Sequence, residues 1–142
     1  MSAPLVSVLI PTYNGARFLE ETLESARNQT HTELEILVGD DASTDDTPAI
    51  LERAAAADPR IRVIRHAENV GAFDNPIVLL EQARGTYVKY LLHDDLLEPD
   101  CIDTLVSAME ADPGARLAFS RHHTLWRRLQ TVRHGQGERD KW

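Results

Sequence analysis

The fold is decided by residues 5–29, which read LVSVLIPTYNGARFLEETLESARNQ. The run from Leu5 to Ile10 is apolar and ends at Pro11, which predicts a strand buried on both faces, as in a parallel sheet. From Arg17 to Gln29 the apolar residues recur at helical spacing and glutamates take the opposite face, which predicts an amphipathic helix. A buried strand followed by such a helix is the first half of a βαβ unit.

The same alternation of strand and helix patterns continues along the chain. Strands are predicted at residues 34–38, 61–65, 86–92 and 116–120. Helices are predicted at residues 47–57, over a short stretch that ends at Arg84 with Gly85 as its C-cap, and from Pro99 to a stop at residues 112–114. Strands separated by helices favour right-handed crossovers. The sequence therefore predicts an α/β fold, a Rossmann-like parallel sheet with helices on both faces.

Composition narrows the class of protein. The 142 residues are 42% hydrophobic and 27% charged, which is typical of a folded globular domain and not of a disordered chain. We find no apolar stretch of membrane-spanning length and no secretory leader, so we expect no membrane span. Cys101 has no partner for an internal disulfide, which indicates a reducing, cytoplasmic location.

Charge divides the chain into two parts. Residues 1–120 contain 9 Lys and Arg against 21 Asp and Glu, whereas residues 121–142 contain 6 against 2. We therefore predict a domain over residues 1–120 and a basic C-terminal extension over residues 121–142, with a helix at 124–132 as an alternative. An acidic body repels nucleic acid, so we expect no nucleic-acid partner, and it can accept a phosphate ligand only with help from a cation or a helix dipole.

Polar residues cluster where the predicted strands end. They follow the first four strands in chain order, at Pro11-Thr12-Tyr13-Asn14, at residues 40–46, at Asn69-Val70-Gly71 and at His93-Asp94-Asp95. Parallel strands place their carboxyl ends on one edge of the sheet, and open α/β sheets bind ligands there. Four separate loops are therefore predicted to meet at one site.

The pair Asp94-Asp95 interrupts a hydrophobic context. Two adjacent carboxylates repel each other unless a cation lies between them and a ligand. Mg²⁺ and Mn²⁺ suit such a place, because they take one or two carboxylates and fill their other positions with water and phosphates. The alternative is structural, since acidic residues ahead of Pro99 also favour the positive end of a helix dipole.

The acidic loop after the second strand has two interpretations. Ser43 to Asp46 has the spacing of a helix cap, which leaves Asp40 and Asp41 without an explanation. A carboxylate fixed at a strand end can accept hydrogen bonds from a ring N–H or a ribose hydroxyl. Asp41 is therefore a candidate for recognition of a base or a sugar.

Taken in order, these motifs resemble the family 2 glycosyltransferases of the GT-A fold. The resemblance covers residues 5–120 and rests on VSVLIPTYNGARFLEETLESARNQT, LEILVGDDASTDDT, ENVGAFDN and ARGTYVKYLLHDDLLEPD. It implies that Pro11, Tyr13 and Asp41 contact the nucleotide of a sugar donor, with Thr12 and Asn14 as supporting loop residues.

The resemblance also gives roles to the acidic pair. It implies that Asp95 binds a divalent metal, Mn²⁺ or Mg²⁺, and that Asp94 faces the ribose or the donor sugar. The implied donor is a UDP-, GDP- or dTDP-linked sugar, the acceptor is unknown, and the reaction is metal-dependent and inverting. A cation would also explain how an acidic chain accepts an anionic donor.

Family members continue beyond the length of this chain, and that further part supplies the acceptor site and the general base. We therefore expect a fold that is truncated relative to a full GT-A domain, and we nominate no catalytic residue. Two hypotheses stay open, a glycosyltransferase and a catalytically silent module that binds nucleotide sugars; a nucleotidyltransferase is a weaker third. An exposed edge would favour a homodimer, and peripheral association with the inner face of the membrane is a further alternative.

Overall fold

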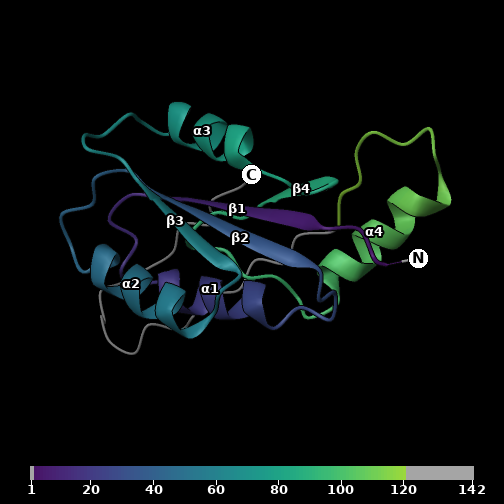
Figure 1. Ribbon diagram of the computed structural model, residues 1–142, viewed down its shortest axis with the longest axis horizontal. Coiled ribbons are helices and arrows are strands. Elements are labelled where there is room, and N and C mark those ends of the chain that lie inside the picture. Colours follow the sequence, from purple (N-terminus) through teal and green to yellow (C-terminus); the bar gives the residue numbers. More distant parts are fainter. Residues whose placement is uncertain (1, 121–142) are drawn as a thin grey trace, which may run out of the picture.

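The computed structural model describes residues 2–120, in which four strands form one parallel sheet in the order β3-β2-β1-β4 (Figure 1). Strands and helices alternate as β1 (Val6–Thr12), α1 (Leu19–Arg27), β2 (Leu34–Asp40), α2 (Thr47–Ala57), β3 (Ile61–Arg65), α3 (Asp74–Gln82), β4 (Tyr87–Tyr90) and α4 (Cys101–Ala111). The direction in which strands are added reverses between β1 and β4, and such reversals mark ligand sites in open α/β sheets. The predicted basic extension, residues 121–142, lies outside the described residues, as does its alternative helix.

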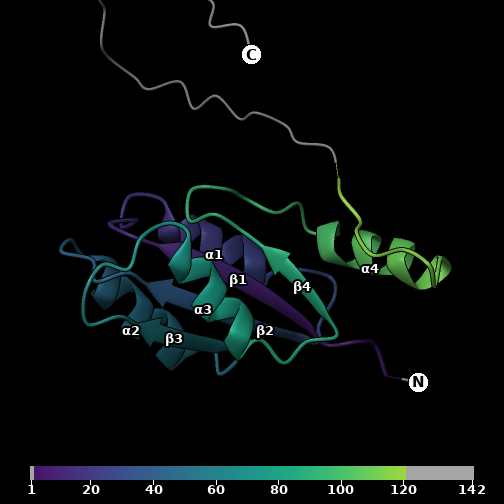
Figure 2. The same ribbon diagram turned by 90° about the horizontal axis from the view of Figure 1, so that it is seen from above.

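Helices cover both faces of the sheet, as predicted. Figure 1 shows α1 and α2 on one face and α3 on the other, and Figure 2 shows α4 beyond the end of α1, next to β4. The side chains of β1 alternate between these layers. Val8 and Ile10 lie in the large core with α1, α2 and α4, whereas Leu9 packs with Leu37 and Leu79 beneath α3. β1 is apolar on both faces because it lies between two hydrophobic cores.

The strand register aligns the carboxyl ends that carry the polar turns. β1 pairs with β2 from Val6 opposite Leu34 to Thr12 opposite Asp40, and Asp40 also pairs with Arg65 at the end of β3. The shorter β4 pairs with β1 as far as Leu9. The turns after all four strands therefore emerge from one edge of the sheet.

Gly85 has a different role from the predicted helix cap. Helix α3 ends at Gln82, and Ala83 is its C-cap residue. A Cβ atom on Gly85 would lie 2.6 Å from the backbone nitrogen of Ser7, and the Gly85 N–H donates to Ser7 Oγ at 2.8 Å. Glycine is needed here because the chain passes against β1 on its way into β4, and not because it ends a helix.

The fifth strand predicted at residues 116–120 is absent from the described part of the chain, where this segment has no regular secondary structure. The side chains of Leu117 and Phe119 are 79% and 87% exposed, so the segment buries neither side chain. The sequence pattern favoured a strand, but a strand also needs a neighbouring strand with which to form hydrogen bonds. Within residues 2–120 no further strand pairs with the outer edge of β4.

An ion cluster fixes the turn between α2 and β3. The Asp58 carboxylate, whose side chain is 8% exposed, accepts hydrogen bonds from Nη2 of Arg60 at 2.8 Å and from Nε of Arg27 at 3.2 Å. The Arg60 guanidinium, with the Arg60 backbone N–H and Arg27, holds the pKa of Asp58 well below its usual range, against the effect of burial. The cluster thereby joins the end of α1 to the start of β3.

We expect Asp58→Asn to lower the free energy of unfolding by about 2 kcal/mol at pH 7, because the arginines lose a charged acceptor. The folded-state pKa is lowered, so the contribution is complete above the unfolded pKa of about 4 and is lost as the pH falls below it. Urea unfolding at pH 7 and pH 3 measures both effects. Glu52→Gln, on the exposed side of α2, is the matched control. Equal stability of wild type and Asp58→Asn at pH 7 would contradict this account.

Candidate functional site

The turns after β1 and β2 are joined through Asn14. Its Oδ1 accepts hydrogen bonds from the backbone N–H of Thr44 at 2.8 Å and of Asp45 at 3.3 Å, and its own N–H donates to Ser43 Oγ at 2.9 Å. Asn14 has φ of 50°, a left-handed conformation that asparagine tolerates better than most residues. One residue therefore closes the first turn onto the second.

Asp45 adds a second link between these turns. Its Oδ2 accepts from the N–H of Ala16 at 3.1 Å, and its Oδ1 accepts from the N–H of Thr47 at 2.9 Å at the start of α2. Burial opposes ionisation, but the hydrogen bonds from Thr47 and Ala16 lower the pKa of Asp45. The predicted cap within residues 43–46 is thus made by Asp45, while Asp46, at the N-cap position, makes no side-chain cap bond.

Asp41 joins the turn after β2 to the turn after β3. The residue is only 3% exposed, and its two carboxylate oxygens accept from the N–H groups of Val70 at 2.6 Å and Gly71 at 2.9 Å. Asn69 Nδ2 donates to the Asp41 carbonyl at 3.3 Å. Gly71 has φ of 96°, which allows consecutive N–H groups to point at one anion. Asp41 therefore organises the third turn, a role that its sequence position alone did not indicate.

Asp40 is fully buried beside Asp41 and stabilises the same turn. Its Oδ1 accepts from the N–H of Ser43 at 3.1 Å, and its Oδ2 lies 3.3 Å from Nε of Arg65. Ala42, which follows Asp41 and precedes Ser43, has φ of 57°, so the turn is tight. Asp40, which had no explanation from the sequence, is a structural carboxylate.

The turn after β4 carries the acidic pair. Both Asp94 and Asp95 are exposed, and the Asp95 N–H donates to the carbonyl of Leu92 at 3.0 Å. A Cβ atom on Gly15 would lie 2.9 Å from Cδ2 of His93 and 2.4 Å from Thr12 Oγ1, so the first turn contacts this turn directly. The four turns therefore touch in series from β4 to β1, β2 and β3.

The four predicted residues at the end of β1 differ in exposure. Tyr13 is 47% exposed and Pro11 is half-buried. Thr12 is 2% exposed, and its hydroxyl has no hydrogen-bond partner among residues 2–120. Asn14 is exposed, but its Oδ1 is used between the turns. Tyr13 therefore has an exposed side chain, while Asn14 joins the loop to the second turn and the Thr12 side chain is buried.

The donor set at Asp94 and Asp95 fits a hard divalent cation. Carboxylate oxygens are preferred ligands of Mg²⁺ and Mn²⁺, and such ions use one or two carboxylates when a ligand's phosphates complete the shell. Within residues 2–120 no three His, Cys, Asp or Glu side chains form a group that could hold a metal by themselves. Any ion here would therefore complete its shell with water and with oxygens from a bound ligand.

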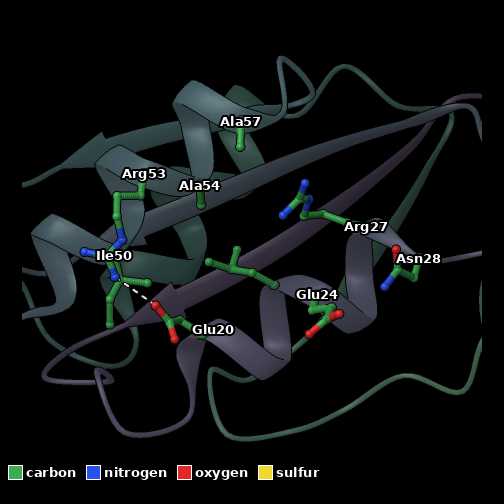
Figure 3. Close-up of a pocket in the computed structure, with 9 residues that line it drawn as sticks. Glu20, Glu24, Arg27, Asn28, Ile50, Arg53, Ala54 and Ala57 are labelled. Carbon is green, nitrogen blue, oxygen red and sulfur yellow. Dashed lines mark hydrogen bonds and ion pairs between the residues drawn. The ribbon is translucent and has the colours of Figure 1, made fainter.

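Two hollows in the described residues lie apart from these turns. The larger, of about 500 Å³, lies between α1 and α2 and contains an ion pair between Arg53 Nη2 and Glu20 Oε1 at 2.8 Å (Figure 3). The smaller, of about 280 Å³, lies between β4, α4 and residues 116–118. Neither is lined by any predicted site residue.

The sequence did not reveal two residues that shape the site. Gly15 allows the contact between the first and fourth turns, and a single glycine in a polar loop gives no such signal. Thr22 lies among apolar residues on the buried face of α1, yet its hydroxyl lies 2.8 Å from the carbonyl oxygen of His93. A buried polar residue within an apolar stripe is the signal that could have identified it.

The open parallel sheet, with its polar turns gathered beside the reversal of strand order, defines an α/β protein of the Rossmann-like class. Comparison with known families narrows this class. The model of glycosyl transferase family 2 matches residues 7–141, and the chain belongs to that family. The family predicted from the motifs is confirmed.

Similar proteins include a chondroitin synthase and a putative glycosyltransferase of teichuronic acid biosynthesis. The chain is 36% identical over 133 residues to chondroitin synthase from Escherichia coli, covering 93% of this chain and 19% of the relative. It is 39% identical over 106 residues to the putative teichuronic acid biosynthesis glycosyltransferase TuaG of Bacillus subtilis, covering 75% of this chain and 42% of the relative. The chain therefore spans less than half the length of these relatives.

Solved structures support the GT-A fold. TarS 1-349 of S. aureus in complex with UDP aligns with a TM-score of 0.70 at 30% identity, over 75% of this chain and 32% of that chain. The mannosyltransferase PcManGT from Pyrobaculum calidifontis, in complex with GDP-Man and Mn²⁺, aligns with a TM-score of 0.68 at 34% identity, over 80% of this chain and 34% of that chain. The fold is thus a GT-A-like sheet that is short compared with the full enzymes.

Proposed function

We propose that this chain binds a nucleoside-diphosphate sugar at the carboxyl edge of its sheet and takes part in metal-dependent, inverting glycosyl transfer. The observation that carries the proposal is the series of contacts that joins all four turns. Asn14 links the first and second turns, Asp41 the second and third, and Gly15 the first and fourth. Motifs that lie far apart in the sequence thereby form one surface. The chain that carries them belongs to glycosyl transferase family 2.

Pro11, Tyr13 and Asp41 are proposed to contact the nucleotide. Tyr13 offers an exposed aromatic ring, which can stack on a base, and Pro11 lies beside it at the end of β1. Each carboxylate oxygen of Asp41 has a second lone pair beyond its bond to the third turn, so it can accept from a base or a ribose. Thr12 and Asn14 hold the loop in place.

Asp95 is proposed to bind Mn²⁺ or Mg²⁺ with the donor's diphosphate, and Asp94 to face the ribose or the sugar. Such an ion supplies Lewis-acid stabilisation of the charge that develops on the leaving diphosphate. Both side chains are exposed at the edge where the other turns meet. Relatives bound to UDP and to GDP-Man with Mn²⁺ favour UDP- or GDP-linked donors, and dTDP remains within the proposal.

A catalytically silent module that binds the donor is the second candidate. It is favoured by the described residues, in which the turns proposed for the donor are joined to one another and no acceptor site is identified within residues 2–120. Transfer also needs a group that deprotonates the attacking hydroxyl, and no described residue is assigned to that role. Donor hydrolysis and transfer to acceptors, measured on the full chain, decide between the two candidates.

We expect Asp95→Ala to weaken binding of the preferred nucleotide in the presence of Mn²⁺ by about 10-fold or more, equivalent to about 1.4 kcal/mol. The physical reason is the loss of the carboxylate that holds the ion. Isothermal titration calorimetry with UDP, GDP and dTDP, with and without Mn²⁺, measures this loss. Glu52→Ala, which removes an exposed carboxylate from α2, should bind as wild type does.

Either of two results would overturn the metal site. One is nucleotide binding by wild type that Mn²⁺ does not strengthen. The other is an Asp95→Ala variant that keeps the full effect of Mn²⁺. Nucleotide binding without any detectable hydrolysis or transfer would instead identify the silent module.

The remaining proposals concern the domain boundaries, the oligomeric state and the cellular location of the protein. We propose residues 1–120 as the donor-binding unit and residues 121–142 as a separate basic extension. The exposed side chains of Val88 and Tyr90 on β4, and of Leu92 just beyond it, support a homodimer or another contact along this strand. None of the helices in residues 2–120 is long and apolar enough to cross a membrane. A cytoplasmic location with peripheral membrane association remains a proposal.

A further inference from the structure

One face of α1 carries polar side chains that bind the backbone of the connection from β4 to α4. Thr22 and Ser25 on α1, and Gln29 just beyond its end, occur at helical spacing, and each has a hydrogen-bond partner in residues 93–102. The connection runs beside α1 for this reason (Figure 2). The acidic pair lies at the start of this connection.

The two later residues of the set fix the far end of the connection. Ser25 Oγ accepts from the N–H of Leu97 at 3.2 Å, and Gln29 Nε2 donates to the carbonyl of Glu98 at 2.8 Å. Gln29 Oε1 also accepts from the N–H of Ile102 at 3.0 Å, at the beginning of α4. These contacts explain how α4 is attached but do not reach the acidic pair.

Thr22 acts on the acidic pair itself. Its side chain is fully buried, and its Oγ1 lies 2.8 Å from the carbonyl oxygen of His93 and 2.9 Å from that of Asp95. These two carbonyls belong to the peptide units 93–94 and 95–96, which lie on either side of the Asp94-Asp95 pair. A hydroxyl has one proton, so these two carbonyls share it with the more distant carbonyl of Phe18, at 3.3 Å. The shorter two contacts hold the backbone of the turn at both ends.

We infer that Thr22 is a positioning residue for Asp94 and Asp95, an inference that rests on the proposed function. Two exposed, adjacent carboxylates repel each other, and within residues 2–120 no hydrogen bond or ion pair of their side chains holds them in the geometry that a cation and a diphosphate need. A buried hydroxyl that fixes the backbone on both sides preorganises them. Thr22 does so without touching the ligand.

A purely structural role for Thr22 makes a different prediction. In that case the hydroxyl only satisfies two buried carbonyls, and its loss would lower stability and weaken nucleotide binding equally with and without metal. A positioning role affects chiefly the part of the affinity that depends on metal. The effect of Mn²⁺ on nucleotide affinity therefore separates the two roles.

The test uses Thr22→Val in the full chain, because valine keeps the shape of threonine and lacks the hydroxyl. We expect the gain in nucleotide affinity on adding Mn²⁺ to fall by about 10-fold, the effect of one lost hydrogen bond, while the affinity without Mn²⁺ changes less than about 2-fold. Thr22→Ser should restore the gain. Ser25→Ala, which removes a hydroxyl from the same face of α1 without touching these carbonyls, should keep it.

Amide hydrogen exchange gives a readout that needs neither metal nor nucleotide. We expect the amides of residues 94–97 to exchange about 10-fold faster in Thr22→Val, because a lost hydrogen bond lowers the local free energy of opening. The amides of β1 and β2 should be unchanged. If Thr22→Val does not fold, Thr22→Ser and Thr22→Ala, which differ by one hydroxyl, give the same comparison.

The outcomes distinguish the inference from the function on which it rests. A wild-type chain that binds no nucleotide more tightly with Mn²⁺ overturns both. A wild-type chain that does so, with a Thr22→Val variant that shows the same gain, overturns only the positioning role. Equal losses with and without Mn²⁺ also overturn it, in favour of the structural role.

Discussion

Gly39→Ala is expected to lower the free energy of unfolding by about 4 kcal/mol, through overpacking and the loss of buried hydrogen bonds. A Cβ atom on Gly39 would lie 2.1 Å from Oδ1 of Asn75 and 3.2 Å from Cδ2 of Leu79. Asn75 cannot turn away without loss, because its Nδ2 donates to the Gly39 carbonyl at 2.9 Å and its Oδ1 lies 3.1 Å from Nε2 of His66. Urea unfolding measures the change, and most natural domains have only about 5–15 kcal/mol to lose.

A double-mutant cycle tests the cause of this loss. Asn75→Ala alone removes the hydrogen bonds to Gly39 and His66, and Gly39→Ala on that background no longer meets the amide. We therefore expect the double variant to be more stable than the sum of the single losses predicts. Gly114→Ala, where the nearest atom is Asp112 Oδ1 at 3.2 Å, is the matched control. Additive losses in the cycle would exclude the proposed clash.

The sheet could be predicted because its signals are local and periodic. The apolar run at the start of the chain, the amphipathic stripe of α1 and the turn residues between elements each depend on neighbours in sequence. The predicted strands at 34–38, 61–65 and 86–92 match β2, β3 and β4 to within two residues at each end. Parallel order then follows from the general rules for crossover connections. The ends of some elements depend on distant contacts and could not be predicted in this way. The end of α3 is an example, because Gly85 packs against Ser7 of β1 and does not cap the helix.

The candidate site was predictable in its location but not in its internal contacts. Strand ends locate the four turns, because parallel strands share an edge. The bonds between turns join residues about thirty positions apart, as Asn14 to Thr44 and Asp41 to Val70 do, and neither composition nor periodicity records such pairs. Thr22 likewise meets His93 across 71 positions. Only the structure shows that these side chains hold the turns together.

Asp41→Ala is expected to lower the free energy of unfolding by about 3 kcal/mol, because each hydrogen bond to a charged acceptor contributes about 1.5–3 kcal/mol. The carboxylate binds the N–H groups of Val70 and Gly71, and alanine leaves both without it. Asp41→Asn keeps one acceptor oxygen and should lose about half as much. Urea unfolding measures stability, and amide exchange at Val70 and Gly71 should accelerate in both variants.

The same variants determine whether Asp41 meets the nucleotide directly or only through the third turn. Gly71→Ala strains a residue with φ of 96° and so loosens that turn while leaving the carboxylate intact. The two variants are compared where they accelerate amide exchange in the third turn by the same factor. If Asp41 contacts the nucleotide directly, Asp41→Ala should then weaken nucleotide binding much more than Gly71→Ala does. Equal losses would show that Asp41 acts through the turn alone, and would remove it from the proposed nucleotide contacts. The hydrogen bonds of Asp41 allow a double role, since its two oxygens bind the turn while their remaining lone pairs can accept from a ligand.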